Sequence, residues 1–192
     1  MSFFNIVAAT NEDTVVAAYE PSKVRSDSYQ SEAELEKEFI RLLCEQGYTY
    51  LSLHTEDELI ANLRSQLEEL NHYHFSDTEW RQFFSDVIAN PNEHIPEKTR
   101  KIQEDNVQVL HRDDGSSKNI TLIDKKNIHN NRLQVINQYE VKQADGARHD
   151  NRYDVTILVN GFPLVHVELK RRGVAIREAF NQINRYQRDS FW

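Results

Sequence analysis

The sequence has little cysteine and no long hydrophobic run, and each shortage excludes a class of protein. One thiol, Cys44, cannot form a disulfide within the chain, so we expect a reduced, intracellular protein rather than a disulfide-stabilised secreted one. No apolar run approaches the roughly 18–20 residues that cross a bilayer, and the first residues lack the basic start of a signal peptide. We therefore predict a cytoplasmic protein without membrane contact.

Glycine is also scarce. The chain has five glycines and no G-x-x-x-x-G-K-[ST] segment, which excludes an ATP site of the P-loop type within it. Hydrophobic residues make up 39% and charged residues 28% of the sequence, as in folded globular domains rather than disordered chains. A length of 192 residues is enough for one α/β domain and does not require two.

The charge is unevenly distributed. The net charge is −8, which at first argues against a nucleic-acid partner. Residues 151–192, however, contain seven Lys and Arg against four acidic residues, a net charge of +3, so the preceding residues carry −11. Because screening confines each charge to about 8–10 Å, a local basic region can bind phosphate even on an acidic protein.

Capping and turn signals divide the chain into one short lead-in and one domain. Residues 1–30 show no periodicity and are expected to be irregular. Residues 31–192 are expected to form the domain, with a helical insertion at about 55–105 and a terminal helix over 174–191. Capping boxes that predict helix starts pair Ser31 with Glu34, Thr55 with Glu58 and Ser76 with Glu79. Gly47 suits the end of the first helix, and β segments are predicted at 48–53, 107–110, 119–123 and 133–141.

The segment 151–173 carries the most informative pattern. Its two β-rich runs flank Asn160-Gly161, a strong hairpin signal. Asp154 near the start of one strand and Glu168 near the end of its antiparallel neighbour can therefore lie side by side. Two adjacent carboxylates repel each other unless a cation lies between them, and Mg²⁺ prefers oxygen ligands of this kind. Lys170 projects to the same side as Glu168, where it could orient an attacking water or stabilise charge at phosphorus.

Each of these residues also has an ordinary explanation. Glu and Lys are common at strand ends, so the acids and the lysine could be solvated. Gln182 and Tyr186, four residues apart, share one side of the terminal helix with Arg185 nearby, which also fits an amphipathic helix with a basic face. Glu36 lies beside the apolar stripe of the first helix and could be surface charge. A zinc site is a weak alternative, because His72 and His74 are the only close histidine pair.

Together, these residues resemble a known family. Asp154, then Glu168-Leu-Lys170, then Gln182-x-x-x-Tyr186 is similar to the PD-(D/E)xK nuclease motif with its Q-x-x-x-Y extension. The likeness spans most of residues 28–192. This part of the sequence closely resembles the N-terminal endonuclease domain of the restriction (R) subunit of type I restriction–modification enzymes. One departure is Tyr153, which stands where the motif has proline. The resemblance implies a restriction-endonuclease-like α/β core, with a mixed central sheet flanked by helices.

The resemblance also implies roles. Asp154, Glu168 and Glu36 would ligate Mg²⁺, with Glu32 as the alternative helix-borne acid, and Lys170 would be the catalytic lysine. Site support or DNA contact would come from Gln182, Arg185 and Tyr186. The implied activity is cleavage of double-stranded DNA within an ATP-dependent complex that contains methyltransferase and specificity subunits. ATP would be needed only by motor domains that this chain lacks, so we expect an N-terminal part of such a subunit. The alternative is a catalytically inert docking or DNA-contact module.

Overall fold

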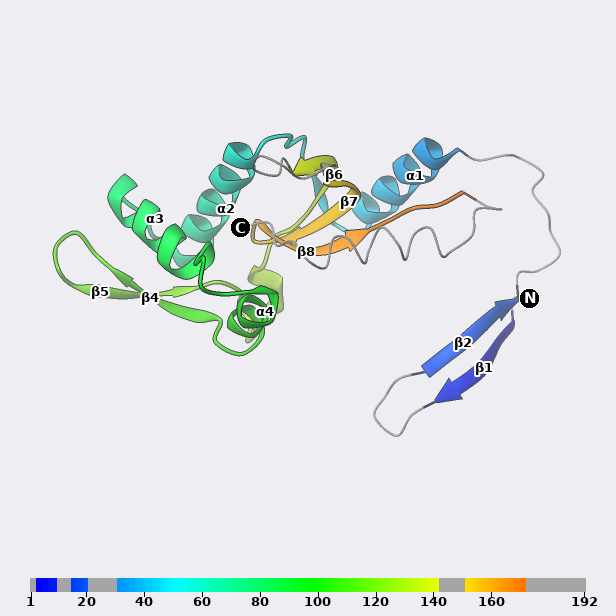
Figure 1. The fold of residues 1–192 in the computed structure, drawn as a ribbon, viewed down its shortest axis with the longest axis horizontal. Helices are drawn as coiled ribbons and strands as arrows, with labels where there is room; N and C mark the ends of the chain where they lie inside the picture. The colour runs from blue at the N-terminus through cyan, green and yellow to red at the C-terminus, as the bar shows by residue number, and fades with distance from the viewer. Residues whose placement is uncertain (1–2, 10–14, 21–30, 142–150, 172–192) are drawn as a thin grey trace. The chain divides into compact units, whose positions relative to one another are not determined.

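The structure is a computed structural model, and the chain divides into two compact units, Met1–Gln30 and Ser31–Trp192. Both units are drawn in Figure 1. The residues that the structure describes are 3–9, 15–20, 31–141 and 151–171. Within these ranges, none of the helices is long and apolar enough to cross a membrane.

The first unit contains a β-hairpin where the sequence predicts an irregular segment. β1 (Phe3–Ala9) and β2 (Val15–Glu20) pair antiparallel, with Phe3 opposite Glu20. Both strands are rich in the β-branched and aromatic residues that favour strands. The prediction is wrong for these two stretches because it depended on alternation, which a short, mostly apolar strand does not show.

The second unit is built around a mixed four-stranded sheet, as the family resemblance implies. The strand order is β3-β6-β7-β8, in which β3 runs parallel to β6 and the other neighbours are antiparallel. The strands span Thr49–Tyr50 (β3), Leu133–Val141 (β6), Asn151–Val159 (β7) and Phe162–Val167 (β8). β3 is shorter than the predicted 48–53, because only two of its residues pair with β6.

Two helices cover the two faces of this sheet. They are α1 (Glu32–Glu45) and α2 (Glu56–Asn71), and both predicted capping boxes at their starts are confirmed. Leu43 of α1 belongs to a cluster with Val135, whereas Leu59 of α2 belongs to a cluster with Ile136. Because adjacent strand residues point to opposite faces, α1 and α2 lie on opposite sides of β6. Figure 1 shows both helices beside β6, β7 and β8.

The remaining elements form a second core between α2 and a small hairpin. The elements are α3 (Asp77–Phe83), a π-helical turn (Phe84–Ile88), α4 (Ile95–Gln103), β4 (Val107–His111), β5 (Ser117–Thr121) and a 3-10 turn (Ile128–Asn130). The capping box predicted at the start of α3 is confirmed. Leu63 and Leu67 of α2 are buried with Trp80, Leu110 and Ile120. This core fixes the position of α2, which in turn supports the sheet.

The turn between β7 and β8 is the predicted hairpin. Asn160 and Gly161 have φ values of 50° and 83°, and Val159 pairs with Phe162. Two central residues with positive φ are typical of a type I′ turn, whose twist matches that of the strands. A Cβ atom on Gly161 would lie 2.6 Å from the Cα atom of Leu63, so the turn packs directly on the backbone of α2.

Candidate active site

The ladder between β7 and β8 brings two acidic residues opposite each other. Val155 pairs with Val167, the last residue of β8. The next position on each strand is Asp154 and Glu168, which continue the same register. The sequence prediction that these two carboxylates lie side by side therefore agrees with the register.

A bulge near the turn sets this register. Leu158 pairs with Pro163, whereas its neighbour Ile157 pairs with Val165, so Leu164 is an extra residue in β8. Without the bulge, a regular ladder continued from the turn would place Val167, the residue before Glu168, opposite Asp154. The bulge shifts β8 by one position and aligns the two acids.

Hydrogen bonds link the two acids and the lysine that follows. The backbone N–H of Leu169 donates to Oδ2 of Asp154 at 2.9 Å, and Nζ of Lys170 is 2.7 Å from Oε1 of Glu168. The Glu168 side chain is 3% exposed and that of Lys170 is 19% exposed. Leu169 packs against the α1 side of the sheet with Val167. The backbone that carries the site is therefore anchored in the core.

Burial and neighbouring charges change the pKa values of Glu168 and Lys170. Burial raises the pKa of Glu168 above its ordinary value, and the Asp154 carboxylate raises it further against the opposing effect of Lys170. Burial disfavours the charged form of Lys170, but the carboxylates of Glu168, Asp154 and Glu32 outweigh it and raise the pKa of its ammonium group. Lys170 is therefore a cation at neutral pH, suited to stabilising negative charge rather than to accepting a proton.

The two strand carboxylates fit a divalent cation. They are hard oxygen donors, and their mutual repulsion, which contributes to the raised pKa of Glu168, is what a cation between them would remove. No three His, Cys, Asp or Glu side chains in the described part of the chain form a ligand group. Mg²⁺ is often held by one or two carboxylates, with water and substrate phosphate completing its shell. Asp154 and Glu168 match that mode.

The structure places Glu36 beside the sheet but in a different set of contacts. Its Oε1 accepts a hydrogen bond from Nδ2 of Asn137 at 2.6 Å, and its Oε2 accepts one from Nε2 of Gln138. Glu32, one turn earlier on α1, accepts a hydrogen bond at 3.3 Å from the backbone N–H of Arg171, next to the catalytic candidate Lys170. Both helix-borne acids thus face this end of the sheet.

Other predicted residues lie elsewhere. Gln182, Arg185 and Tyr186 are outside the described residues. His72 ends α2 in the left-handed conformation, and His74 is an exposed residue with Nδ1 3.0 Å from Oε2 of Glu68. Within the described ranges the histidine pair joins no ligand group, so nothing there supports the zinc alternative.

The sequence does not point to the polar residues around Glu36. Besides Asn137 and Gln138, they include Tyr50, which donates to Oδ1 of Asn137 at 2.9 Å, and Arg152, whose Nε donates to Oε1 of Gln138. The available signal is the Asn-Gln pair inside the β segment "LQVINQYEV", where two adjacent amides interrupt an otherwise strand-like run. Neither amide belongs to the motif that identifies the acids.

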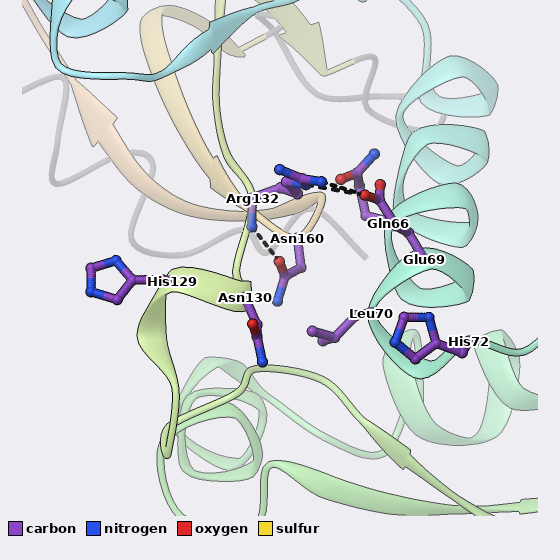
Figure 2. A pocket seen from close by; sticks show the side chains of 8 residues that line it. All are labelled: Gln66, Glu69, Leu70, His72, His129, Asn130, Arg132 and Asn160. Carbon is purple, nitrogen blue, oxygen red and sulfur yellow. Dashed lines mark hydrogen bonds and ion pairs between the residues drawn. The ribbon is translucent and has the colours of Figure 1, made fainter.

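A separate surface pocket lies at the turn end of the same hairpin (Figure 2). There the Arg132 guanidinium is 2.6 Å from Oε1 of Glu69, and the backbone N–H of Arg132 donates to Oδ1 of Asn160 at 2.8 Å. Figure 2 shows these residues with His72 and His129 on the pocket walls. Asn160 is in the turn, whereas Asp154 and Glu168 are at the open end, so this pocket is distinct from the acidic pair.

The fold and the site together define a class. A mixed sheet between helices, with an Asp and a Glu-x-Lys set at the open end of a β-hairpin, is consistent with the restriction-endonuclease-like fold. Residues 29–191 match the family model described as "Type I restriction enzyme R protein N terminus", and the chain belongs to this family.

Curated relatives agree with this family. The chain is 48% identical over 186 residues to the type I restriction enzyme EcoprrI endonuclease subunit of Escherichia coli, a match that covers 96% of the chain and 58% of the relative. It is 37% identical over 168 residues to the SsaAORF53P endonuclease subunit of Staphylococcus saprophyticus, covering 85% of the chain and 17% of that relative. The chain therefore spans little more than half of the first relative and a much smaller share of the second.

Proposed function

We propose that this chain is a Mg²⁺-dependent endonuclease domain that hydrolyses phosphodiester bonds of double-stranded DNA in a type I restriction enzyme. The observation that carries the proposal is the convergence of Asp154, Glu168 and Lys170 at the open end of the β7–β8 hairpin. The names of the relatives, which are endonuclease subunits, support the same reaction class.

Each residue of the site would have a separate role in the reaction. Asp154 and Glu168 would hold Mg²⁺, with Glu36 as the third carboxylate of the site, and the bound ion would supply Lewis-acid stabilisation of charge on the phosphoryl oxygens. The Leu169 N–H fixes one Asp154 oxygen, so the other oxygen would be the one available to the ion. In the reaction, water adds to phosphorus and loses a proton, the P–O bond to the leaving sugar oxygen breaks, and that oxygen gains a proton.

Lys170 acts as a fixed positive charge. Its ammonium group is held against Glu168 at 2.7 Å, so it lies beside the position where phosphate would meet the carboxylates. Because its pKa is raised, it remains charged and stabilises negative charge that grows on the phosphoryl oxygens during attack.

Partners follow from the family rather than from the geometry. By resemblance, methyltransferase and specificity subunits would choose the DNA sequence, and ATP would be used by motor domains outside this chain. The domain itself would then cut with little sequence preference.

The test is cleavage of unmethylated plasmid DNA by a restriction complex assembled from a subunit that contains this chain together with the ATP-using motor domains, and from the other subunits. We expect Asp154→Ala, Glu168→Gln and Lys170→Met each to lower the cleavage rate by about 10²-fold or more while assembly is retained. Matched controls are Glu104→Gln at the end of α4 and Lys118→Met on β5, which change the same residue types away from the site and leave cleavage unchanged. Wild-type cleavage by Asp154→Ala would refute the proposal and favour an inert docking module.

A further inference from the structure

The backbone of β6 is irregular at the level of the acidic pair. Gln138 has a φ value of 53°, in the left-handed region that residues other than glycine rarely adopt. The pairs on either side, Asn137 with Val155 and Tyr139 with Tyr153, place Gln138 opposite Asp154. Strained residues of this kind persist where the surroundings enforce them, and they gather at functional sites.

The left-handed residue allows two neighbouring side chains to reach one carboxylate. In a regular strand, Asn137 and Gln138 would point to opposite faces. Here Asn137 Nδ2 donates to one oxygen of Glu36 and Gln138 Nε2 donates to the other. The same break in alternation places Ile136 and Tyr139, three positions apart, in one hydrophobic cluster.

The direction of both amides is fixed by their other partners. Arg152 can only donate, and an ionised Glu36 can only accept, so the Gln138 carboxamide between them must turn its oxygen to Arg152 and its nitrogen to Glu36. The Tyr50 hydroxyl donates to Oδ1 of Asn137, which leaves the nitrogen of Asn137 for Glu36. The two amides are therefore oriented donors rather than incidental neighbours.

We propose that Asn137 and Gln138 form a carboxylate clamp, and that Gln138 is a positioning residue that acts through Glu36. The clamp fixes the α1 carboxylate at the level of Asp154. Since the acids in the described ranges do not form one three-membered ligand group, Glu36 would act on the cation through a water molecule. Each Glu36 oxygen retains a second lone pair for that purpose. This inference rests on the proposed Mg²⁺-dependent function.

The test measures binding of Mn²⁺ alone to the full chain by electron paramagnetic resonance, without DNA or activity. Glycine accepts the left-handed conformation, so Gln138→Gly is expected to fold and to raise the Kd for Mn²⁺ by less than the roughly 10- to 100-fold that loss of a partner of a direct ligand causes. Gln138→Asn, which also tolerates this φ but is one methylene shorter, is a second variant with the same expected direction.

A double mutant tests whether Gln138 acts through Glu36. Glu36→Gln is expected to weaken Mn²⁺ binding, and adding Gln138→Gly to it should cause little further loss. The matched control is Gln134→Ala on the same strand, which removes a reciprocal amide pair with Asn62 at 3.0 and 3.1 Å and should leave the Kd unchanged.

The outcomes separate this inference from the proposed function. An unchanged Kd in folded Gln138→Gly and Gln138→Asn, or a loss that adds in full to that of Glu36→Gln, overturns the clamp but leaves the nuclease proposal standing. Failure of the wild-type chain to bind Mn²⁺, or equal binding by Asp154→Ala, overturns both. Circular dichroism and urea midpoints establish that each variant is folded before its Kd is compared.

Discussion

Replacing Gly161 by alanine should destabilise the domain through a steric clash with α2. The residue has a φ value of 83°, and its Cβ would lie 2.6 Å from the Cα and 3.0 Å from the N of Leu63. Left-handed backbone costs a residue with a side chain about 1–2 kcal/mol. Forcing atoms into the packed contact adds about 1–3 kcal/mol, because the obstacle is buried helix backbone that cannot rotate away. The free energy of unfolding should therefore fall by about 2–5 kcal/mol.

Gly115→Ala is the matched control for this prediction. Gly115 has almost the same φ value, 81°, but nothing lies within 4 Å of the Cβ position. The free energy of unfolding of Gly115→Ala should fall only by the backbone contribution of about 1–2 kcal/mol. Urea unfolding followed by tryptophan fluorescence is suitable, because Trp80 is buried in the core that α2 shares. Equal losses of stability in the two variants would refute the claim that the hairpin turn rests on Leu63.

Three further predictions concern the hairpin and its acids. Asn160→Ala should lower the free energy of unfolding by about 3 kcal/mol in urea titrations, because buried donors and acceptors around the turn lose their partners. Glu168→Gln should make the metal-free chain at least as stable as wild type at pH 7, since the raised pKa of Glu168 means that its ionised form opposes folding. Mn²⁺ should raise the Tm of the wild-type chain in calorimetry, and Asp154→Ala should abolish this shift.

Each of these predictions has a result that contradicts it. For Asn160, the variant Asn160→Gly keeps the backbone freedom, so equal stability of Asn160→Gly and wild type would show that the side-chain hydrogen bonds contribute nothing. For Glu168, wild type should lose stability relative to Glu168→Gln as pH rises from the ordinary pKa of 4.5 through the raised folded value. A stability difference between wild type and Glu168→Gln that stays constant across that pH range would contradict the prediction. A Tm shift retained in Asp154→Ala would place the ion elsewhere.

Local signals in the sequence predict the helices and the hairpin well. The capping boxes at Ser31, Thr55 and Ser76 depend on residues three positions apart, and all three are confirmed. Asn160-Gly161 likewise specifies its own turn, since both residues tolerate positive φ. The β1–β2 hairpin is missed because its strands do not alternate. Signals that lie within a few residues are thus readable without tertiary structure.

Features that depend on pairing with distant residues are not predictable in this way. The bulge at Leu164 is defined only by which residues of β7 face β8, yet it decides that Glu168 lies opposite Asp154. The left-handed conformation of Gln138 is likewise enforced by contacts with α1 and β7, because glutamine has no local preference for it. Family resemblance identifies the acids, whereas the structure identifies the amides that hold one of them.

The most direct test of the central claim is a crystal of the chain soaked in Mn²⁺, with anomalous diffraction used to locate the ion. We expect one strong peak about 2.1 Å from carboxylate oxygens of both Asp154 and Glu168, the distance typical of small divalent cations. A fully occupied ion bound away from these two residues, or a soaked crystal with no peak between them, would contradict it.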